Sequence, residues 1–392
     1  MKVVVAMDSF KGSLSSLEAG EAIKTGILKA RSDAQVQVCP LADGGEGTVE
    51  ALALGMGGKL ESVSVTGPLG EKVDCLYGIL EESKTAIVEM SGAAGITLVA
   101  DAERNTLNTT TYGVGEVMKD AIQKGCRHFI VGIGGSATND GGIGMLQALG
   151  YGMLDKDGKQ VSLGAKGVQD IVKITDDEVI PELKECFFRI ACDVSNPLCG
   201  ENGCSAIFGP QKGATPEMVK DMDAWLMEYA KLTSAKYEKA DATYPGTGAA
   251  GGMGFAFLAY TNAVLESGIK IVLEETKLEE YIKDADIVIT GEGRLDGQTA
   301  FGKAPIGVAK IAKQYDKTVL AFAGSVTKDA VECNEHGIDA FFPILRGIQT
   351  LQEAMDSNNA RENMVATVEQ VFRLINKSGN SVTTKSIKRS RK

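Results

Sequence analysis

Histidine is nearly absent from this sequence: among 392 residues there are only two, His128 and His336. A catalytic triad built on histidine and a metal site with several histidine ligands are therefore not expected, and proton transfer would fall to a carboxylate or a lysine. The eight cysteines include no Cys-x-x-Cys pair, so the usual spacing of a zinc site is also missing. Buried, reduced thiols are the expected state of these cysteines.

Long apolar runs are missing as well. The apolar residues between Lys2 and Asp8 are too few for the core of a signal peptide and suit a first β-strand instead. The longest uncharged stretch, residues 243–265, contains a proline and five glycines. This composition is typical of a glycine-rich loop that leads into a helix, and not of a membrane span. We therefore expect a cytoplasmic protein that does not enter a membrane.

Positive charge is in short supply, since 41 Lys and Arg face 52 Asp and Glu and the net charge is −11. A chain this acidic repels nucleic acid and anionic membranes, so neither is expected as a partner. Residues 377–392 are the exception, with six basic residues and no acid. We interpret them as a flexible, solvated terminus, and an arm that binds nucleic acid or membrane is the alternative.

What the chain has is an ordinary apolar content of 44% and an unusual number of glycines, 47. Short β-branched runs alternate with helical patterns, which predicts an α/β protein with parallel sheets. No linker rich in proline or serine divides the chain, so two domains would be arranged with one inserted in the other. The expected strands are Lys2–Met7, Gln35–Cys39, Glu61–Thr66, Val73–Leu80, Thr85–Glu89, His128–Ile133, Phe187–Cys192, Ile287–Thr290 and Val319–Ala323, and the expected helices are Ser16–Ala30, Gly113–Lys124, Ile143–Leu149, Met218–Thr233, Lys303–Tyr315 and Leu351–Asn376.

Ligands of open α/β sheets bind beyond the carboxyl ends of the strands, and the most unusual turn there is Gly132–Gly142 (GIGGSATNDGG). Its glycines, hydroxyls and amide predict a cradle for the phosphates of a nucleotide. The residues expected to contact the nucleotide are Gly134, Gly135, Ser136, Thr138, Asn139 and Asp140.

The same loop supports a rival interpretation. Gly132, Gly134 and Ala137 fit the dinucleotide pattern G-x-G-x-x-A, and Asp155 lies near the position that binds a ribose. An oxidoreductase that uses a nicotinamide cofactor is therefore the alternative, although the scarcity of histidine counts mildly against it.

Charged residues follow several other predicted strands. Asp8, Ser9 and Lys11 lie between the first strand and a helix start, where a lysine suits an anion. Asp43 and Glu46 flank two glycines and could orient a hydrated Mg²⁺.

Two later turns carry the candidate bases. Asp193 follows another strand and is a candidate base. Arg294 and Asp296 offer an anion clamp and a second carboxylate. The segment Gly297–Lys303 matches G-x-x-x-x-G-K, but Ala304 stands where a P-loop needs a hydroxyl for Mg²⁺. These groups suit phosphoryl transfer, which asks for positioning and charge neutralisation more than for covalent chemistry.

Several long motifs resemble the bacterial glycerate kinase family. They run in order from Met1 to about Asn376 and are Asp8–Ser13 (DSFKGS), Ala42–Thr48 (ADGGEGT), Thr109–Glu116 (TTTYGVGE), Gly132–Gly142, Cys192–Leu198 (CDVSNPL), Gly248–Gly254 (GAAGGMG) and Thr290–Asp296 (TGEGRLD). The resemblance implies phosphorylation of D-glycerate by ATP, at the 2-hydroxyl and giving 2-phosphoglycerate, with the 3-hydroxyl as the alternative. A nicotinamide oxidoreductase and a non-catalytic nucleotide-binding module remain the competing functions.

The resemblance also implies two α/β domains with the active site in the cleft between them. One domain, Rossmann-like with a parallel sheet, would be built from both chain ends, residues 1–70 and 285–376. The second would be inserted as residues 71–284, with residues 377–392 as the tail. The oligomeric state is left open, a homodimer being one option.

With glycerate as the substrate, we expect Lys11 and Arg294 to neutralise its carboxylate or the transferring phosphate, with Asp8 and Ser9 beside them. Asp193 is the predicted base for the glycerate hydroxyl, with Asp296 as the alternative. ATP and Mg²⁺ are the expected cofactors.

Overall fold

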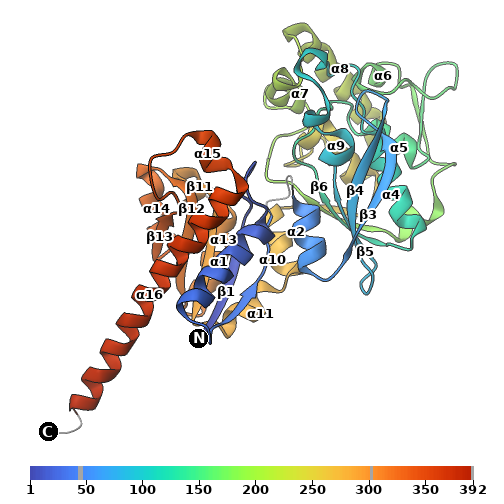
Figure 1. The fold of residues 1–392 in the computed structure, drawn as a ribbon. Coiled ribbons are helices and arrows are strands. Elements are labelled where there is room, and N and C mark those ends of the chain that lie inside the picture. The colour runs from blue at the N-terminus through green and yellow to red at the C-terminus, as the bar shows by residue number, and fades with distance from the viewer. Residues whose placement is uncertain (43–46, 301–302, 390–392) are drawn as a thin grey trace. The chain divides into compact units, whose positions relative to one another are not determined.

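The computed structural model describes residues 1–42, 47–300 and 303–389 and divides the chain into two compact units (Figure 1). Unit 1 consists of residues 1–43 and 272–392, and unit 2 of residues 44–271. The expected α/β class, with one unit built from both chain ends and the other inserted, is confirmed.

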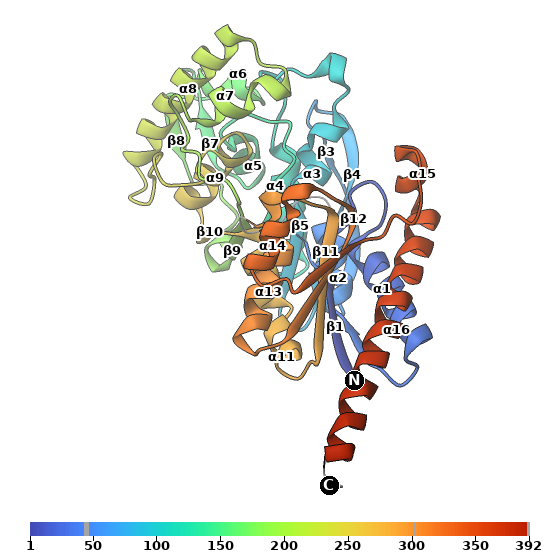
Figure 2. The same ribbon diagram turned by 90° about the vertical axis from the view of Figure 1, so that its left-hand side faces the viewer.

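Unit 1 contains a parallel five-stranded sheet of order β13-β12-β11-β1-β2. One face is covered by α1 and α16, which lie side by side, and α13 lies on the other face (Figure 2). Because both faces are covered, the central strands are apolar without alternation. The strands are β1 (Lys2–Met7), β2 (Gln35–Val38), β11 (Ile287–Leu295), β12 (Thr318–Val326) and β13 (Ala340–Pro343). The helices are α1 (Ser16–Ala30), α11 (Leu278–Lys283), α12 (Gly297–Ala300), α13 (Ala304–Gln314), α14 (Glu332–Glu335), α15 (Leu351–Met355) and α16 (Ser357–Arg389), with the 3₁₀ turn η5 (Lys328–Val331); α10 (Gly268–Glu275) crosses the boundary at 271.

Unit 2 contains a mixed six-stranded sheet of order β10-β9-β6-β5-β4-β3, in which β4 is antiparallel to both of its neighbours, β3 and β5. Its strands are β3 (Lys59–Thr66), β4 (Lys72–Leu80), β5 (Thr85–Glu89), β6 (His128–Gly132), β9 (Phe187–Ala191) and β10 (Ala263–Glu266), and β7 (Gly152–Leu154) pairs with β8 (Lys173–Thr175). Its helices are α2 (Thr48–Gly55), α3 (Ser91–Ala94), α4 (Tyr112–Gln123), α5 (Ile143–Ala148), α6 (Ala165–Val168), α7 (Cys204–Phe208), α8 (Pro216–Ser234) and α9 (Ala249–Tyr260), with 3₁₀ turns η1 (Ile96–Leu98), η2 (Asp101–Glu103), η3 (Pro181–Glu185) and η4 (Pro210–Lys212).

The unit boundaries differ from those expected at residues 70 and 284. Residues 59–66 belong to unit 2 because β3 pairs with β4 along its whole length. Helix α16 continues to Arg389, so it includes most of the segment for which the sequence predicted a flexible tail. The expected helix Leu351–Asn376 is divided at Asp356 into α15 and α16.

Strand β11 is longer than the sequence indicated, since it was expected to end at Thr290 and it ends at Leu295. Glycine and charge in the segment Gly291–Arg294 predicted a turn. Pairing with β12, which puts Arg294 opposite Ser325, overrides that local preference. None of the helices in the described ranges is long and apolar enough to cross a membrane.

Candidate active site

The loop after β6 has an exposed first half. Gly134 and Gly135 are exposed, and Gly135 has a φ of 73°. Within the described residues, the backbone N–H groups of Gly134, Gly135 and Ser136 donate to no acceptor. The neighbouring positions are fixed, because the Gly135 carbonyl accepts from Ile96 N (2.8 Å) and Ala137 N donates to Ala94 O (2.9 Å). Successive free N–H groups around a left-handed residue are a common anion site.

The second half of this loop is buried. Thr138, Asn139 and Asp140 have no exposed surface, so their side chains face the interior of unit 2 and not a surface ligand. Asp140 accepts hydrogen bonds from Thr111 N (2.8 Å), Thr111 Oγ1 (2.9 Å) and Gly142 N (3.1 Å). Burial raises the pKa of Asp140, and these hydrogen bonds oppose the shift. The geometry therefore favours a supporting role for these three predicted nucleotide ligands.

A buried lysine lies under the loop. Lys212, in η4, is 3% exposed and its Nζ donates to Ser136 Oγ (2.6 Å) and to the Thr138 carbonyl (2.7 Å). Burial lowers the pKa of Lys212 to about 8, while Cys204 and Asp140 act in the opposite direction. A lysine side chain is thus hydrogen-bonded to Ser136, one of the three residues whose N–H groups find no acceptor among the described residues.

The second glycine-rich segment, at the start of α9, packs against this loop. Ala250, Gly251 and Gly252 have positive φ values of 53°, 65° and 95°. A Cβ on Gly251 would lie 2.1 Å from Thr138 O, so only glycine permits this approach. The Gly251 carbonyl also accepts from Gly141 N at 2.9 Å. This segment, for which the sequence predicted a glycine-rich loop leading into a helix, therefore supports the loop after β6 through close backbone contacts.

In the sheet of unit 1 the order of the strands reverses between β1 and β11. The chain continues from β1 to β2 on one side of this point and from β11 to β12 on the other. Ligands bind at the carboxyl ends of strands next to such a switch point. Asp8 is buried directly after β1, and its N–H donates to Gly291 O (2.9 Å). Lys11 is exposed in the following turn, which packs against Gly293 of β11. The predicted substrate residues of unit 1 therefore lie at the switch point.

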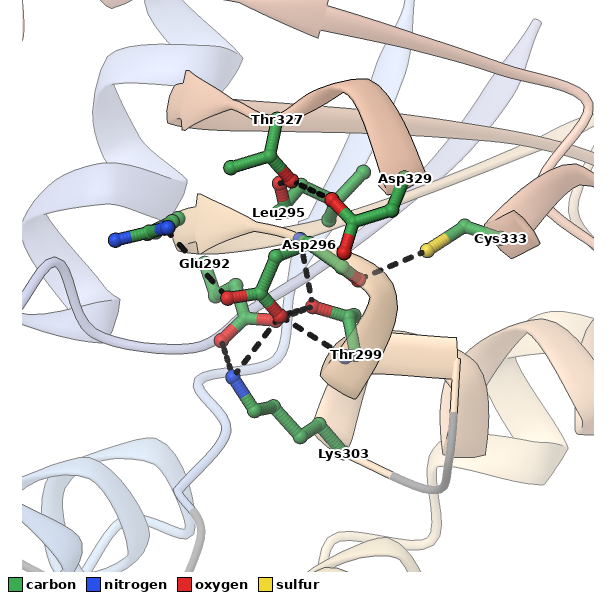
Figure 3. A network of polar contacts seen from close by, with 9 residues as sticks. Glu292, Leu295, Asp296, Thr299, Lys303, Thr327, Asp329 and Cys333 are labelled. Atoms are coloured by element: carbon green, nitrogen blue, oxygen red, sulfur yellow. Dashed lines mark hydrogen bonds and ion pairs between the residues drawn. The ribbon is translucent and has the colours of Figure 1, made fainter. Parts of the chain in front are cut away.

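A polar network lies at the end of β11 (Figure 3). Thr299 Oγ1 donates to Glu292 Oε1 (2.7 Å), and Thr299 N donates to Asp296 Oδ1 (3.2 Å). Lys303 Nζ lies 3.4 Å from Glu292 Oε2 and 3.9 Å from Asp296 Oδ1. Burial raises the pKa of Glu292, and the Thr299 hydroxyl and Lys303 oppose this. Arg294, two-thirds exposed, has its Nε 3.6 Å from Asp296 Oδ2. The alternative base, Asp296, is thus paired with Arg294, which precedes it by two residues.

Asp193 belongs to unit 2, whereas the network at the end of β11 belongs to unit 1. Asp193 is exposed after β9, and its Oδ1 accepts from Gly268 N at 3.1 Å. The carboxylate therefore caps the start of α10, a role that nothing in the adjacent sequence indicated.

The predicted magnesium ligands Asp43 and Glu46 lie outside the described residues. Within the described ranges no group of three or more His, Cys, Asp or Glu side chains is arranged to hold a metal ion. Glu292 and Asp296 provide a carboxylate pair, which suits Mg²⁺ because this ion keeps several waters and needs one or two carboxylates when it also binds phosphates.

Two residues of the candidate site were missed by the sequence reasoning. Glu292 stands between two glycines near the end of a predicted strand, which could have identified it. Lys212 lies in GPQKGAT, and its distance of 76 residues from Ser136 left no local signal.

The structure does not support a dinucleotide site around Asp155. Asp155 Oδ1 accepts from Asp157 N and Lys159 N, both at 2.9 Å, and so closes a turn after β7. β7 belongs to a separate two-stranded sheet, and α5 begins only at Ile143, well beyond the end of β6. A dinucleotide fold needs the acid at the end of a neighbouring parallel strand and the helix directly after the loop.

Comparison with known proteins agrees with the kinase interpretation. The sequence profile of the "Glycerate kinase family" matches residues 3–376. A Haemophilus influenzae protein named "Glycerate kinase" is 48% identical, with 96% of this chain and 99% of the relative aligned. An Escherichia coli protein named "Glycerate 2-kinase" is also 48% identical, over 90% of this chain and 93% of the relative. The crystal structure of a "putative glycerate kinase 2" from Salmonella typhimurium is similar, with a TM-score of 0.89, 46% identity, and 97% and 99% of the two chains covered. The expected oxidoreductase alternative is thereby set aside, and the chain belongs to the glycerate kinase family.

Proposed function

We propose that this protein transfers the γ-phosphoryl group of ATP to D-glycerate, at the 2-hydroxyl. The structural observation that carries the proposal is the run of three N–H groups at Gly134–Ser136 that find no acceptor in the described part of the chain, next to the buried ammonium of Lys212. Such a run supports polyphosphate binding. The choice of the 2-hydroxyl is supported by the E. coli relative, which is named a 2-kinase.

The nucleotide half of the reaction is assigned to the loop after β6. Gly134, Gly135 and Ser136 would contact phosphate oxygens through their N–H groups, because Gly134 and Gly135 are exposed and Ser136 directly follows them. Thr138, Asn139 and Asp140 would hold the loop in shape from below, since their side chains are buried. Preorganised donors of this kind need no rearrangement when charge develops on the transferring group.

The glycerate half is assigned to the switch point of unit 1. Lys11 and Arg294 supply positive charge there, and Asp8 and Ser9 form the adjoining turn, in which Ser9 N donates to Asp8 Oδ1 at 2.7 Å. Two cations suit a substrate that has one carboxylate and becomes a phosphate monoester.

A base must accept the proton of the glycerate hydroxyl. Asp193 stays the predicted base, and its Oδ1 accepts a hydrogen bond from Gly268 N. Asp296 stays the alternative. The raised pKa of Glu292 adds a third candidate, because a base works best when its pKa approaches the working pH.

Mg²⁺ is part of the proposal. When bound, it would neutralise charge on the phosphates. Glu292 and Asp296 suit it by their chemistry, and Asp43 and Glu46, which lie outside the described residues, stay predicted ligands.

The test is a coupled assay of ADP release with D-glycerate, followed by ³¹P–¹H correlation NMR of the product. The proposal expects release of ADP that depends on D-glycerate, and phosphorus coupled to the C2 proton. Coupling to the C3 protons would move the transfer to the 3-hydroxyl, and no release of ADP would contradict the kinase function. The expected cytoplasmic location and the homodimer option stay predictions, the latter open to light scattering of the purified protein.

A further inference from the structure

The contact between Lys212 and Ser136 fixes the direction of a hydrogen bond. A lysine ammonium has three donors and no acceptor, so in the 2.6 Å contact Lys212 Nζ donates and Ser136 Oγ accepts. The hydroxyl proton of Ser136 must therefore point elsewhere. Within the described residues no acceptor receives it.

The surroundings of Ser136 indicate where this proton can go. The side chain lies at the boundary of the interior, 8% exposed, next to exposed Gly134 and Gly135. The N–H groups of the same three residues also have no acceptor in the described part of the chain. Four donors without acceptors thus lie on consecutive residues, which is an arrangement that suits an anion.

Among the described residues, the ammonium of Lys212 behind these donors is not hydrogen-bonded to a carboxylate. Its partners are a hydroxyl and a backbone carbonyl. A buried ammonium costs stability unless a negative group balances it. A bound anion would provide that balance through the polarised hydroxyl.

We propose that Lys212 is a positioning residue that turns the Ser136 hydroxyl into a charge-assisted donor for the polyphosphate of the nucleotide. The relay runs from the ammonium to Ser136 Oγ, and from the Ser136 hydroxyl to a phosphate oxygen. The inference rests on the proposed function and adds to it the residue that supplies charge to the nucleotide loop.

The relay acts only while Lys212 is protonated. Burial lowers the pKa of Lys212 to about 8. The titratable groups that face it are Asp140, from the same loop, and Cys204, at the start of α7, and a negative charge on either would favour the protonated form. Burial raises the pKa of Cys204 to about 11, so it stays neutral over this range. Arg104, whose backbone packs on Gly213, is paired with Asp101 at 2.6 Å. ADP affinity is therefore expected to weaken as the pH rises through about 8.

The test is a double-mutant cycle with Lys212→Met and Ser136→Ala. The affinity for ADP, at fixed Mg²⁺, is measured by isothermal titration calorimetry at pH 7. Each single variant is expected to bind ADP about 10- to 100-fold more weakly, as for the loss of a charge-assisted hydrogen bond. Every variant interrupts the same relay. The double variant is therefore expected to bind ADP with no lower affinity than the single variant of lower affinity.

A pH series separates positioning from simple support. The loss of affinity between pH 7 and 9 is expected in the wild type and absent in Lys212→Met, both measured against the same ligand so that its own titration cancels. Thr109→Val is the control, because it removes another hydrogen bond to the loop, from Thr109 Oγ1 to Ala137 O (2.9 Å), without touching the relay. It should keep the wild-type pH dependence.

Three outcomes would overturn the relay. They are additive losses in the double variant, an unchanged pH dependence in Lys212→Met, and wild-type ADP affinity in Ser136→Ala. If Lys212→Met does not fold, Ser136→Ala and the wild-type pH series decide alone. A wild-type protein that binds ADP and phosphorylates glycerate while Ser136→Ala binds ADP equally well removes the relay and leaves the kinase function intact. Failure of the wild type to bind ADP removes both.

Discussion

The Thr299 hydroxyl donates a 2.7 Å hydrogen bond to Oε1 of Glu292 and so joins the end of β11 to the first turn of α12. The same threonine closes a local turn with Asp296 through two hydrogen bonds of 3.2 Å, from Asp296 N to Thr299 Oγ1 and from Thr299 N to Asp296 Oδ1. One threonine therefore fixes two carboxylates whose negative charges repel each other. The arrangement makes Glu292 the acid whose removal is most informative.

Glu292→Gln is expected to keep the hydrogen bond from Thr299 and to remove the ionised carboxylate. The pKa of Glu292 is higher in the folded protein than in the unfolded chain. The free energy of unfolding therefore falls as the pH rises through the folded-state pKa. At pH 7 the variant should therefore unfold at the same or a higher temperature, and the difference should shrink as the pH falls toward 4.5. Calorimetric melting at several pH values measures this, and a melting temperature clearly below that of the wild type at pH 7 would show that the pair with Lys303 outweighs the burial cost.

Gly135→Val is expected to abolish nucleotide binding while the fold persists. A β-branched residue is strained at a φ of 73°, at a cost of about 1–2 kcal/mol, and its methyl groups would cover the free N–H groups. The nearest atom to an added Cβ is Ser91 Cβ at 3.5 Å, so no severe clash is expected. ADP titration together with circular dichroism measures the effect; unchanged affinity in a folded variant contradicts the cradle, and loss of the fold indicates a purely structural turn.

Lys11→Met and Arg294→Met are each expected to lower kcat/KM for D-glycerate by about 10²–10³-fold, because each removes a donor to a developing or bound anion. Steady-state kinetics with glycerate varied at saturating ATP measures this. Lys24→Met, a substitution of an exposed helix lysine paired with Glu21, is the control and should match the wild type. Near-wild-type kcat/KM for both Lys11→Met and Arg294→Met would show that these two side chains are surface charges with no part in binding glycerate.

Asp193→Asn separates catalysis from capping. The amide oxygen can still accept from Gly268 N, so the start of α10 keeps its hydrogen bond, but the basicity is lost. If Asp193 is the base, the variant binds ATP and glycerate normally and turns over at least ~10²-fold more slowly. A single-turnover experiment measures the chemical step. Full activity would remove Asp193 from the mechanism and leave Asp296 and Glu292, which the matching Asn and Gln variants test.

Much of the architecture could be predicted from the sequence because it depends on local patterns. The apolar run Val3–Met7 predicted a first strand, and the structure buries every residue of this run in β1, against which α1 packs. The capping box of Ser15 and Glu18 set the first helix turn, where the two residues exchange hydrogen bonds. Glycine-rich turns after strands marked the loops at which we propose the site.

What the sequence determined by itself was therefore the alternation of strands and helices, the scarcity of histidine and the position of the glycine-rich loops proposed to carry the site, since each of these depends on neighbouring residues. Tertiary structure alone decided which side of a loop faces the solvent, and it turned Thr138, Asn139 and Asp140 inward while leaving Gly134 and Gly135 outside. It also brought Lys212 to Ser136, and β12 alongside β11 so that Glu292 stands in a strand. These outcomes depend on burial and on hydrogen bonds between residues far apart in the chain. Both contribute to stability only once the whole unit has packed, so no local sequence pattern predicts them.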